Sequence, residues 1–84
     1  MNIDAGDTVF HRPTGEEWLV GCVDGGKLYW LGWPPGRADV ADCELRKKAC
    51  PEDRLMWLRA LAKPGRDESD DRTRIARRQL AHNY

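Results

Sequence analysis

The sequence predicts an α+β fold, in which a small curled antiparallel sheet or partial barrel is followed by one or two C-terminal helices. Glycine is concentrated in the first part of the chain, where 7 of the 8 glycines precede Ala49 and separate short apolar runs. After Ala49, apolar residues recur with helical spacing. The 84 residues fit a single domain, which we divide into a β-rich module (1–50), a packing helix (51–63) and a charged helical tail (64–84).

Four short segments of the β-rich module are rich in the apolar, β-branched and aromatic residues that strands favour. Their expected bounds are Asp7–Arg12, Glu17–Val23, Lys27–Trp33 and Ala41–Lys47. Gly25 and Gly26 predict a tight hairpin between the second and third segments, because both central positions of such a turn can take positive φ. Pro34 and Pro35 end the third strand, since proline cannot donate to a ladder. The pattern over 36–40 predicts no particular geometry, so we expect four or five strands.

The packing helix begins at Pro51, which suits the first turn of a helix, and acidic residues follow at the positive end of the helix dipole. Its apolar residues form one face that further apolar residues widen: Leu55, Leu58, Leu61 and Ala62, then Met56, Trp57 and Ala60. We therefore expect this helix to pack against the sheet and to leave some apolar surface uncovered. Pro64 and Gly65 end it.

The tail begins acidic and becomes basic, which is the order that a helix dipole favours. Glu68–Arg72 and Asp70–Arg74 have the i,i+4 spacing of stabilising ion pairs. The apolar stripe is thin and consists of Ala76, Leu80 and Tyr84, with Ile75 beside it. The pattern fits a docked helix, a projecting helix or a frayed tail.

The composition of the chain limits the functions that it can have. Charged residues make up 33% of the chain but the formal net charge is zero, so there is no global attraction to nucleic acid or to an anionic membrane. No apolar run is long enough to span a membrane, and the N-terminus lacks the pattern of a signal peptide, which favours the cytoplasm. The odd number of cysteines, 3, favours reduced thiols.

The residues that could carry chemistry do not form a recognisable catalytic or metal site. Cys22, Cys43, Cys50 and His11 could supply four metal ligands, but they lack the close pairs of structural zinc sites. Burial in strands is the simpler interpretation of Cys22 and Cys43. No motif of a hydrolase nucleophile, a phosphate-binding loop or a metalloprotease is present. We predict no catalysis, no metal and no cofactor.

The aromatic run from Tyr29 to Trp33 is the strongest candidate for a binding surface, because Trp, Tyr and Arg dominate interface hot spots. Strand alternation places Trp30 and Trp33 on opposite faces, unless a bulge at Gly32 shifts the facing. The residues expected to contact a protein partner are Tyr29, Trp33, Pro34, Pro35 and Arg37. The alternative is that the aromatics, Trp18 and Trp30 above all, simply form the core.

The tail arginines are the second candidate surface. Arg72, Arg74, Arg77 and Arg78 could contact phosphates of a nucleic acid or form a second protein interface. Acidic residues at 67–71 would neutralise part of this cluster, so a solvated and ion-paired helix face is the simpler interpretation.

Several motifs in about the first 48 residues are distinctive. They are Gly6-Asp7-Thr8-Val9, Pro13-Thr14-Gly15-Glu16-Glu17-Trp18, Gly32-Trp33-Pro34 and Asp42-Cys43-Glu44-Leu45. In these motifs the chain resembles a family of small proteins encoded by tailed phages and prophages of proteobacteria. The opening motif and the turn after it also look like the start of SH3-like barrels such as KOW and Tudor modules, which implies an SH3-like sheet.

The resemblance to phage proteins implies a small accessory protein that binds a host protein. An inhibitor of a host defence system, such as an anti-CRISPR protein, is one concrete form. We therefore expect a non-enzymatic protein-binding factor. The alternatives are a nucleic-acid-binding module that uses the tail arginines, and a self-assembling structural phage protein whose helix or tail forms a symmetric homodimer.

Overall fold

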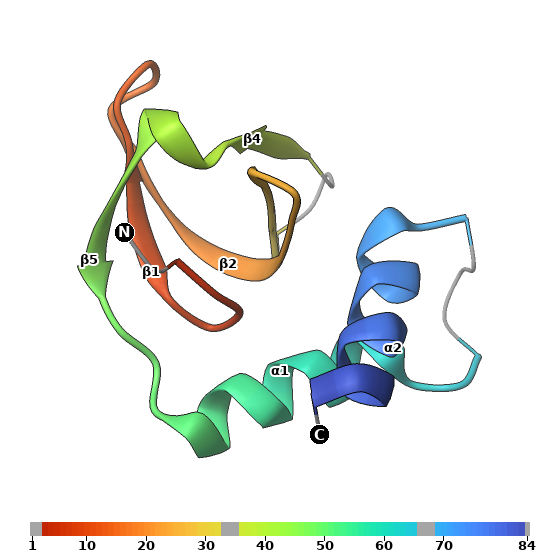
Figure 1. The fold of residues 1–84 in the computed structure, drawn as a ribbon. Helices are drawn as coiled ribbons and strands as arrows, with labels where there is room; N and C mark the ends of the chain where they lie inside the picture. Colours follow the sequence, from red (N-terminus) through yellow and green to blue (C-terminus); the bar gives the residue numbers. More distant parts are fainter. Residues whose placement is uncertain (1–2, 33–35, 66–68, 84) are drawn as a thin grey trace.

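The computed structural model describes residues 3–32, 36–65 and 69–83. These residues form five strands, two α-helices and one 3-10 turn (Figure 1): β1 (Thr8–His11), β2 (Glu16–Asp24), β3 (Lys27–Trp30), β4 (Arg37–Asp39), η1 (Val40–Asp42), β5 (Cys43–Lys47), α1 (Pro51–Ala62) and α2 (Asp71–Asn83). The α+β fold predicted from the sequence is confirmed.

The five strands form one antiparallel sheet in the order β4-β3-β2-β1-β5. β4 and β5 lie at its two ends and are connected through η1, so the sheet curls without closing into a barrel (Figure 1). This is the SH3-like partial barrel expected from the sequence. The fifth strand, β4, lies in the segment for which the sequence pattern predicted no geometry.

Two predicted strand boundaries were wrong by more than one residue. β3 ends at Trp30 rather than Trp33, because its pairing with β4 ends at Tyr29 and the Trp30 N–H donates to the Gly36 carbonyl (3.3 Å) as the chain turns. The last strand begins at Cys43 rather than Ala41, because η1 occupies the residues before it. The predicted hairpin is confirmed, with positive φ at both of its glycines.

A β-bulge at Gly21 changes the face of the sheet toward which the buried side chains of β2 point. Val20 lies opposite Trp30 and Cys22 lies opposite Tyr29, so β2 has one extra residue at this point. The position is crowded, because a Cβ on Gly21 would lie 3.1 Å from the Tyr29 carbonyl oxygen. As a result, Val20 packs inside the curl whereas Cys22 packs toward the helices.

Two apolar clusters lie on the two sides of the sheet. The inner cluster fills the curl and consists of Ile3, Val9, Val20, Leu28 and Cys43. The outer cluster lies between the sheet and the helices and consists of Ala5, Cys22, Leu58, Leu61, Ile75 and Ala76. Figure 1 shows both helices together on one side of the curled sheet. The burial of Ile75 and Ala76 means that the tail is a docked helix.

A buried carboxylate joins the N-terminal turn to the start of α1. Asp7 is fully buried, accepts hydrogen bonds from the N–H groups of Ala49 (2.7 Å) and Asp4 (2.9 Å), and pairs with Lys48 (3.1 Å) and Arg54 (3.3 Å). Burial raises the pKa of Asp7, but the bonds from Ala49, Asp4 and Lys48 outweigh it and hold the pKa below its ordinary value. This network fixes the position of α1 against the sheet.

Candidate protein-binding groove

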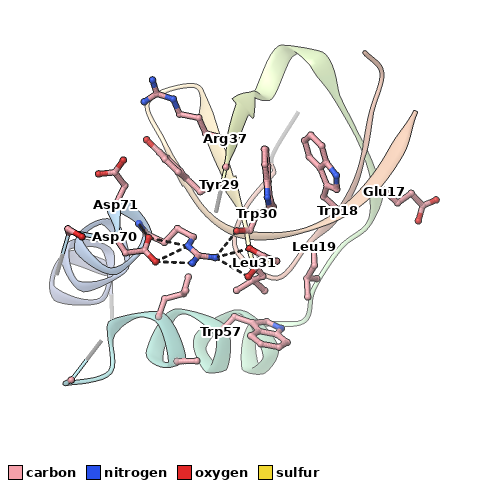
Figure 2. Close-up of a pocket in the computed structure, with 17 residues that line it drawn as sticks. Glu17, Trp18, Leu19, Tyr29, Trp30, Leu31, Arg37, Trp57, Asp70 and Asp71 are labelled. Atoms are coloured by element: carbon pink, nitrogen blue, oxygen red, sulfur yellow. Dashed lines mark hydrogen bonds and ion pairs between the residues drawn. The ribbon is translucent and has the colours of Figure 1, made fainter. Parts of the chain in front are cut away.

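An open groove lies between the outer face of the sheet and the two helices (Figure 2). Its described lining comes from β2, β3, β4, α1, the start of α2 and nearby turns: Glu17, Trp18, Leu19, Tyr29, Trp30, Leu31, Gly32, Gly36, Arg37, Trp57, Ala60, Leu61, Gly65, Ser69, Asp70, Asp71 and Arg72. Aromatic and aliphatic side chains are thus combined with charged groups of both signs.

The sheet forms one wall of the groove, and its register sets the order of side chains along that wall. Arg37 of β4 lies directly opposite Tyr29 of β3. Beyond β3, the Leu31 N–H donates to the Leu19 carbonyl of β2 (2.9 Å). Glu17 lies two residues before Leu19 and therefore on the same face of β2. The order of side chains along the wall, from β4 to β2, is therefore Arg37, Tyr29, Leu31, Leu19 and Glu17. This order places a cation at one end, an anion at the other and apolar groups between them.

Helix α1 forms the facing wall through Trp57, Ala60 and Leu61. The N-terminal turn lies close to this wall, because a Cβ on Gly6 would lie 3.2 Å from Cδ1 of Trp57. Figure 2 shows Leu19 pointing from β2 toward Trp57. Leu19 is 36% exposed and Trp57 is half-buried, so the two side chains form an apolar ridge that is open to solvent. We call this pair the Leu19–Trp57 ridge.

Arg72 connects the start of α2 to the end of β3. Its guanidinium donates to the backbone carbonyls of Trp30 (3.0 Å), Leu31 (2.9 Å) and Gly32 (3.4 Å), and it forms a forked ion pair with Asp70 (2.8 Å). Figure 2 shows these bonds inside the groove. Arg72 is only 5% exposed, and its guanidinium donors are already used by groups within the chain. These bonds hold the start of α2 against the sheet.

Three rings pack against one another across β1, β2 and β3: His11 stacks on Trp18, and Trp30 lies tilted against Trp18. The ring centroids of His11 and Trp18 lie 4.2 Å apart, and those of Trp18 and Trp30 lie 4.3 Å apart. Gly36 lies against the Trp30 ring so closely that it has no room for a side chain. Trp18 and Trp30 are half-buried, and Trp18 packs against the inner cluster without being part of it. Both tryptophans thus contribute to packing beside the core that the sequence proposed for them, and both also line the groove.

The groove contains two of the predicted protein-binding residues. Tyr29 and Arg37 lie side by side on its sheet wall, whereas Trp33, Pro34 and Pro35 lie outside the described residues. The Leu19–Trp57 ridge was not among the binding residues predicted from the sequence. Two signals could have found it: Leu19 alternates with Trp18 and so faces outward, and Trp57 lies outside the main apolar stripe of its helix.

The structure separates the four tail arginines that the sequence grouped as a phosphate-binding cluster. Arg72 is buried, as described above. The Nε–H of Arg77 donates to the Ala62 carbonyl (3.1 Å) at the end of α1, which is one of the free carbonyls of a helix C-terminus. Arg78 pairs with Asp24 (2.8 Å) beside the β2–β3 hairpin.

The remaining tail arginine, Arg74, pairs with Asp71 on the surface of α2. The predicted pairing of Arg74 with Asp70 was wrong, because Asp70 is committed to Arg72. Each tail arginine therefore has a partner inside the chain, in agreement with the ion-paired helix face.

The four candidate metal ligands are not brought together as a set, although His11 and Cys43 lie opposite each other on β1 and β5. Cys22 lies in the outer cluster, Cys43 in the inner cluster and Cys50 on the surface, while His11 bonds Thr14. Burial raises the pKa of Cys22 to about 12 and also raises the pKa of Cys43. In the described parts of the chain, no group of three or more His, Cys, Asp or Glu side chains could hold a metal ion.

Comparison with known proteins finds no matching family model, no matching curated protein and no matching solved structure. Over the described ranges, none of the helices has the length and apolar character needed to cross a membrane.

Proposed function

We propose that this chain is a non-enzymatic protein-binding module and that the groove between the sheet and the helices is its binding surface. The observation that carries the proposal is the set of side chains that face one open hollow: Tyr29, Arg37 and the Leu19–Trp57 ridge. Tyrosine, tryptophan and arginine dominate the energetics of protein interfaces. An exposed apolar ridge between charged groups is typical of an interaction site.

The buried contacts that hold the two walls of the groove in place support the same proposal. Asp7 fixes α1 through Arg54, and Arg72 fixes the start of α2 against the end of β3. Both walls are therefore held by buried charge-assisted hydrogen bonds that exist before any partner arrives. A preorganised surface loses less conformational freedom on binding, which improves affinity.

The resemblance of the N-terminal motifs to small phage and prophage proteins supports a host protein as the partner. Inhibition of a host defence system, as by an anti-CRISPR protein, is one form that such binding takes. A small rigid domain acts in this way by covering a surface that the host protein needs, without chemistry of its own.

Affinity capture from a bacterial host lysate tests the proposal with three versions of the chain. Leu19→Thr removes the exposed apolar side chain while keeping a residue that strands favour. Met56→Gln is the control, because Met56 is 51% exposed on α1 but does not line the groove. We expect wild type and Met56→Gln to recover the same partner, and Leu19→Thr to recover at least about tenfold less.

Thermal unfolding of all three versions checks that each is folded before capture. Equal recovery by wild type and Leu19→Thr would sink the proposal, and loss in Met56→Gln would in that case place the binding surface on the exposed side of α1.

A further inference from the structure

We propose that the groove of one copy docks on the groove of a second copy, in a two-fold dimer in which Arg37 of each copy meets Glu17 of the other. The inference rests on the proposed function, because it names a partner surface for the same groove. It follows from the order of charges along the sheet wall.

The wall has a charge of opposite sign at each end and an apolar middle. Arg37 and Glu17 are both exposed, and neither has an ion-pair partner among the described residues. Figure 2 shows Arg37 and Glu17 on opposite sides of the close-up, with Trp30, Trp18 and Leu19 between them. A surface with this pattern fits a partner that carries the same pattern in reverse order.

A second copy turned by a two-fold rotation presents that reversed order. In such an interface, if residue i of one copy contacts residue j of its partner, then j also contacts i. The cation at the β4 end then faces the anion at the β2 end twice. Leu19 of each copy faces Tyr29 of the other, and the two Leu31 side chains lie nearest the axis. A parallel arrangement would instead place like charges together.

The other charged groups of the groove do not oppose this arrangement, because each is neutralised within its own chain. Asp70 is paired with the buried Arg72, and Asp71 is paired with Arg74. Arg37 and Glu17, which have no ion-pair partner among the described residues, therefore set the orientation of the two copies. Self-docking and binding of a host protein would compete for the same groove, so a bound partner should convert dimers to monomers.

Charge reversal tests the dimer without any other ligand. We expect wild type to show a concentration-dependent monomer–dimer equilibrium in sedimentation velocity. Glu17→Arg alone and Arg37→Glu alone should each weaken dimerisation by at least about tenfold, because each places two like-charged pairs in the interface. An equimolar mixture of the two variants should recover the dimer, since every pair across the interface is then of opposite charge. Both substitutions are at exposed positions, and circular dichroism checks that both variants fold.

Three results would overturn the inference: wild type that stays monomeric across the concentration series, single variants that dimerise as wild type does, or a mixture that remains monomeric. The second result would indicate a dimer through another surface, such as the outer face of α1. Failure of this inference is distinguishable from failure of the proposed function. If wild type is monomeric but Leu19→Thr still fails to recover the host protein, the dimer alone is rejected. If the two charge variants dimerise only when mixed but Leu19→Thr recovers the host protein as wild type does, the host-binding groove alone is rejected.

Discussion

At the scale of single residues, Gly36 determines where the Trp30 indole lies. A Cβ on Gly36 would lie 2.6 Å from Cε2 of Trp30 and nearer still to two other atoms of the ring. Because Trp30 packs at a tilt against Trp18, which stacks on His11, movement of one ring disturbs all three.

We predict that Gly36→Ala destabilises the chain by about 1–3 kcal/mol, the usual cost of overpacking, and changes the near-ultraviolet circular dichroism of the tryptophans. Gly32→Ala is the matched control, since its Cβ would lie 3.9 Å from Trp30. Equal effects of the two substitutions on urea unfolding would contradict the proposed packing of Trp30 on Gly36.

The buried carboxylate of Asp7 makes stability depend on pH. Its pKa is held below the ordinary value in the folded chain, so the unfolded chain takes up a proton more readily. The stabilisation is therefore fully present above the unfolded pKa of about 3.9 and is lost as pH falls further, through the folded pKa. We expect the free energy of unfolding to decrease steeply below about pH 4.

Asp7→Asn tests this assignment. It removes the charge that Arg54 and Lys48 face, and we predict a loss of about 3 kcal/mol at neutral pH, as for other broken buried ion pairs. The remaining acid dependence should become shallower. An Asp7→Asn variant with the same acid unfolding curve as wild type would assign the pH dependence to other carboxylates.

At the scale of elements, Arg72 is the contact that fixes α2. Replacing it with alanine would leave Asp70 and the carbonyls of Trp30 and Leu31 without their donors in a buried site. We predict a loss of about 3–5 kcal/mol, or detachment of α2 while the sheet persists. Hydrogen exchange would show the latter as faster exchange of α2 amides alone.

Arg74→Ala is the matched control for Arg72, because Arg74 forms an exposed pair one turn away with Asp71 and should contribute only about 0.2–1 kcal/mol. Arg72→Lys keeps the charge but not the planar fork, so it should recover only part of the stability. Full stability of Arg72→Lys would show that charge alone, rather than the fork of donors, holds α2.

At the scale of the whole molecule, the two apolar clusters predict the reactivity of the three cysteines. Cys22 and Cys43 are fully buried, and burial raises the pKa of both thiols, to about 12 for Cys22. Because the thiolate is the reactive form, only the exposed Cys50 should react readily with a disulfide reagent at neutral pH.

The remaining two thiols should become reactive in denaturant. Mass spectrometry of the labelled peptides identifies the sites. Rapid labelling of Cys22 in the folded chain would contradict the packing of the helices over the outer face of the sheet.

The sequence predicted the elements whose causes are local. The hairpin followed from Gly25 and Gly26, and α1 followed from Pro51 and the spacing of its leucines. The three-residue strand β4 could not be predicted, because its pairing with β3 depends on tertiary contacts rather than on its own composition. The sequence pattern left open a bulge at Gly32 but did not indicate the one at Gly21, where the buried side chains of β2 change from the inner cluster to the outer cluster.

The groove was only partly predictable for the same reason. Tyr29 and Arg37 were selected for their residue types, and the structure places them on one wall. Leu19 and Trp57 lie far apart in the sequence and meet only because α1 packs on β2. The roles of the tail arginines depend on contacts that sequence spacing does not show, such as the bonds from Arg72 to carbonyls about forty residues away.

The central claim is that the groove between the sheet and the helices is a protein-binding surface. The most direct test is the nitrogen-15 spectrum of the labelled chain, backbone amides and tryptophan side chains together, recorded with and without the partner recovered by capture. We predict that the signals of Leu19, Tyr29, Arg37 and the Trp57 indole change on binding, while those of Arg46 and Lys63 do not. Changes confined to the exposed side of α2 around Arg74 and Arg78, with the groove unaffected, would contradict the claim.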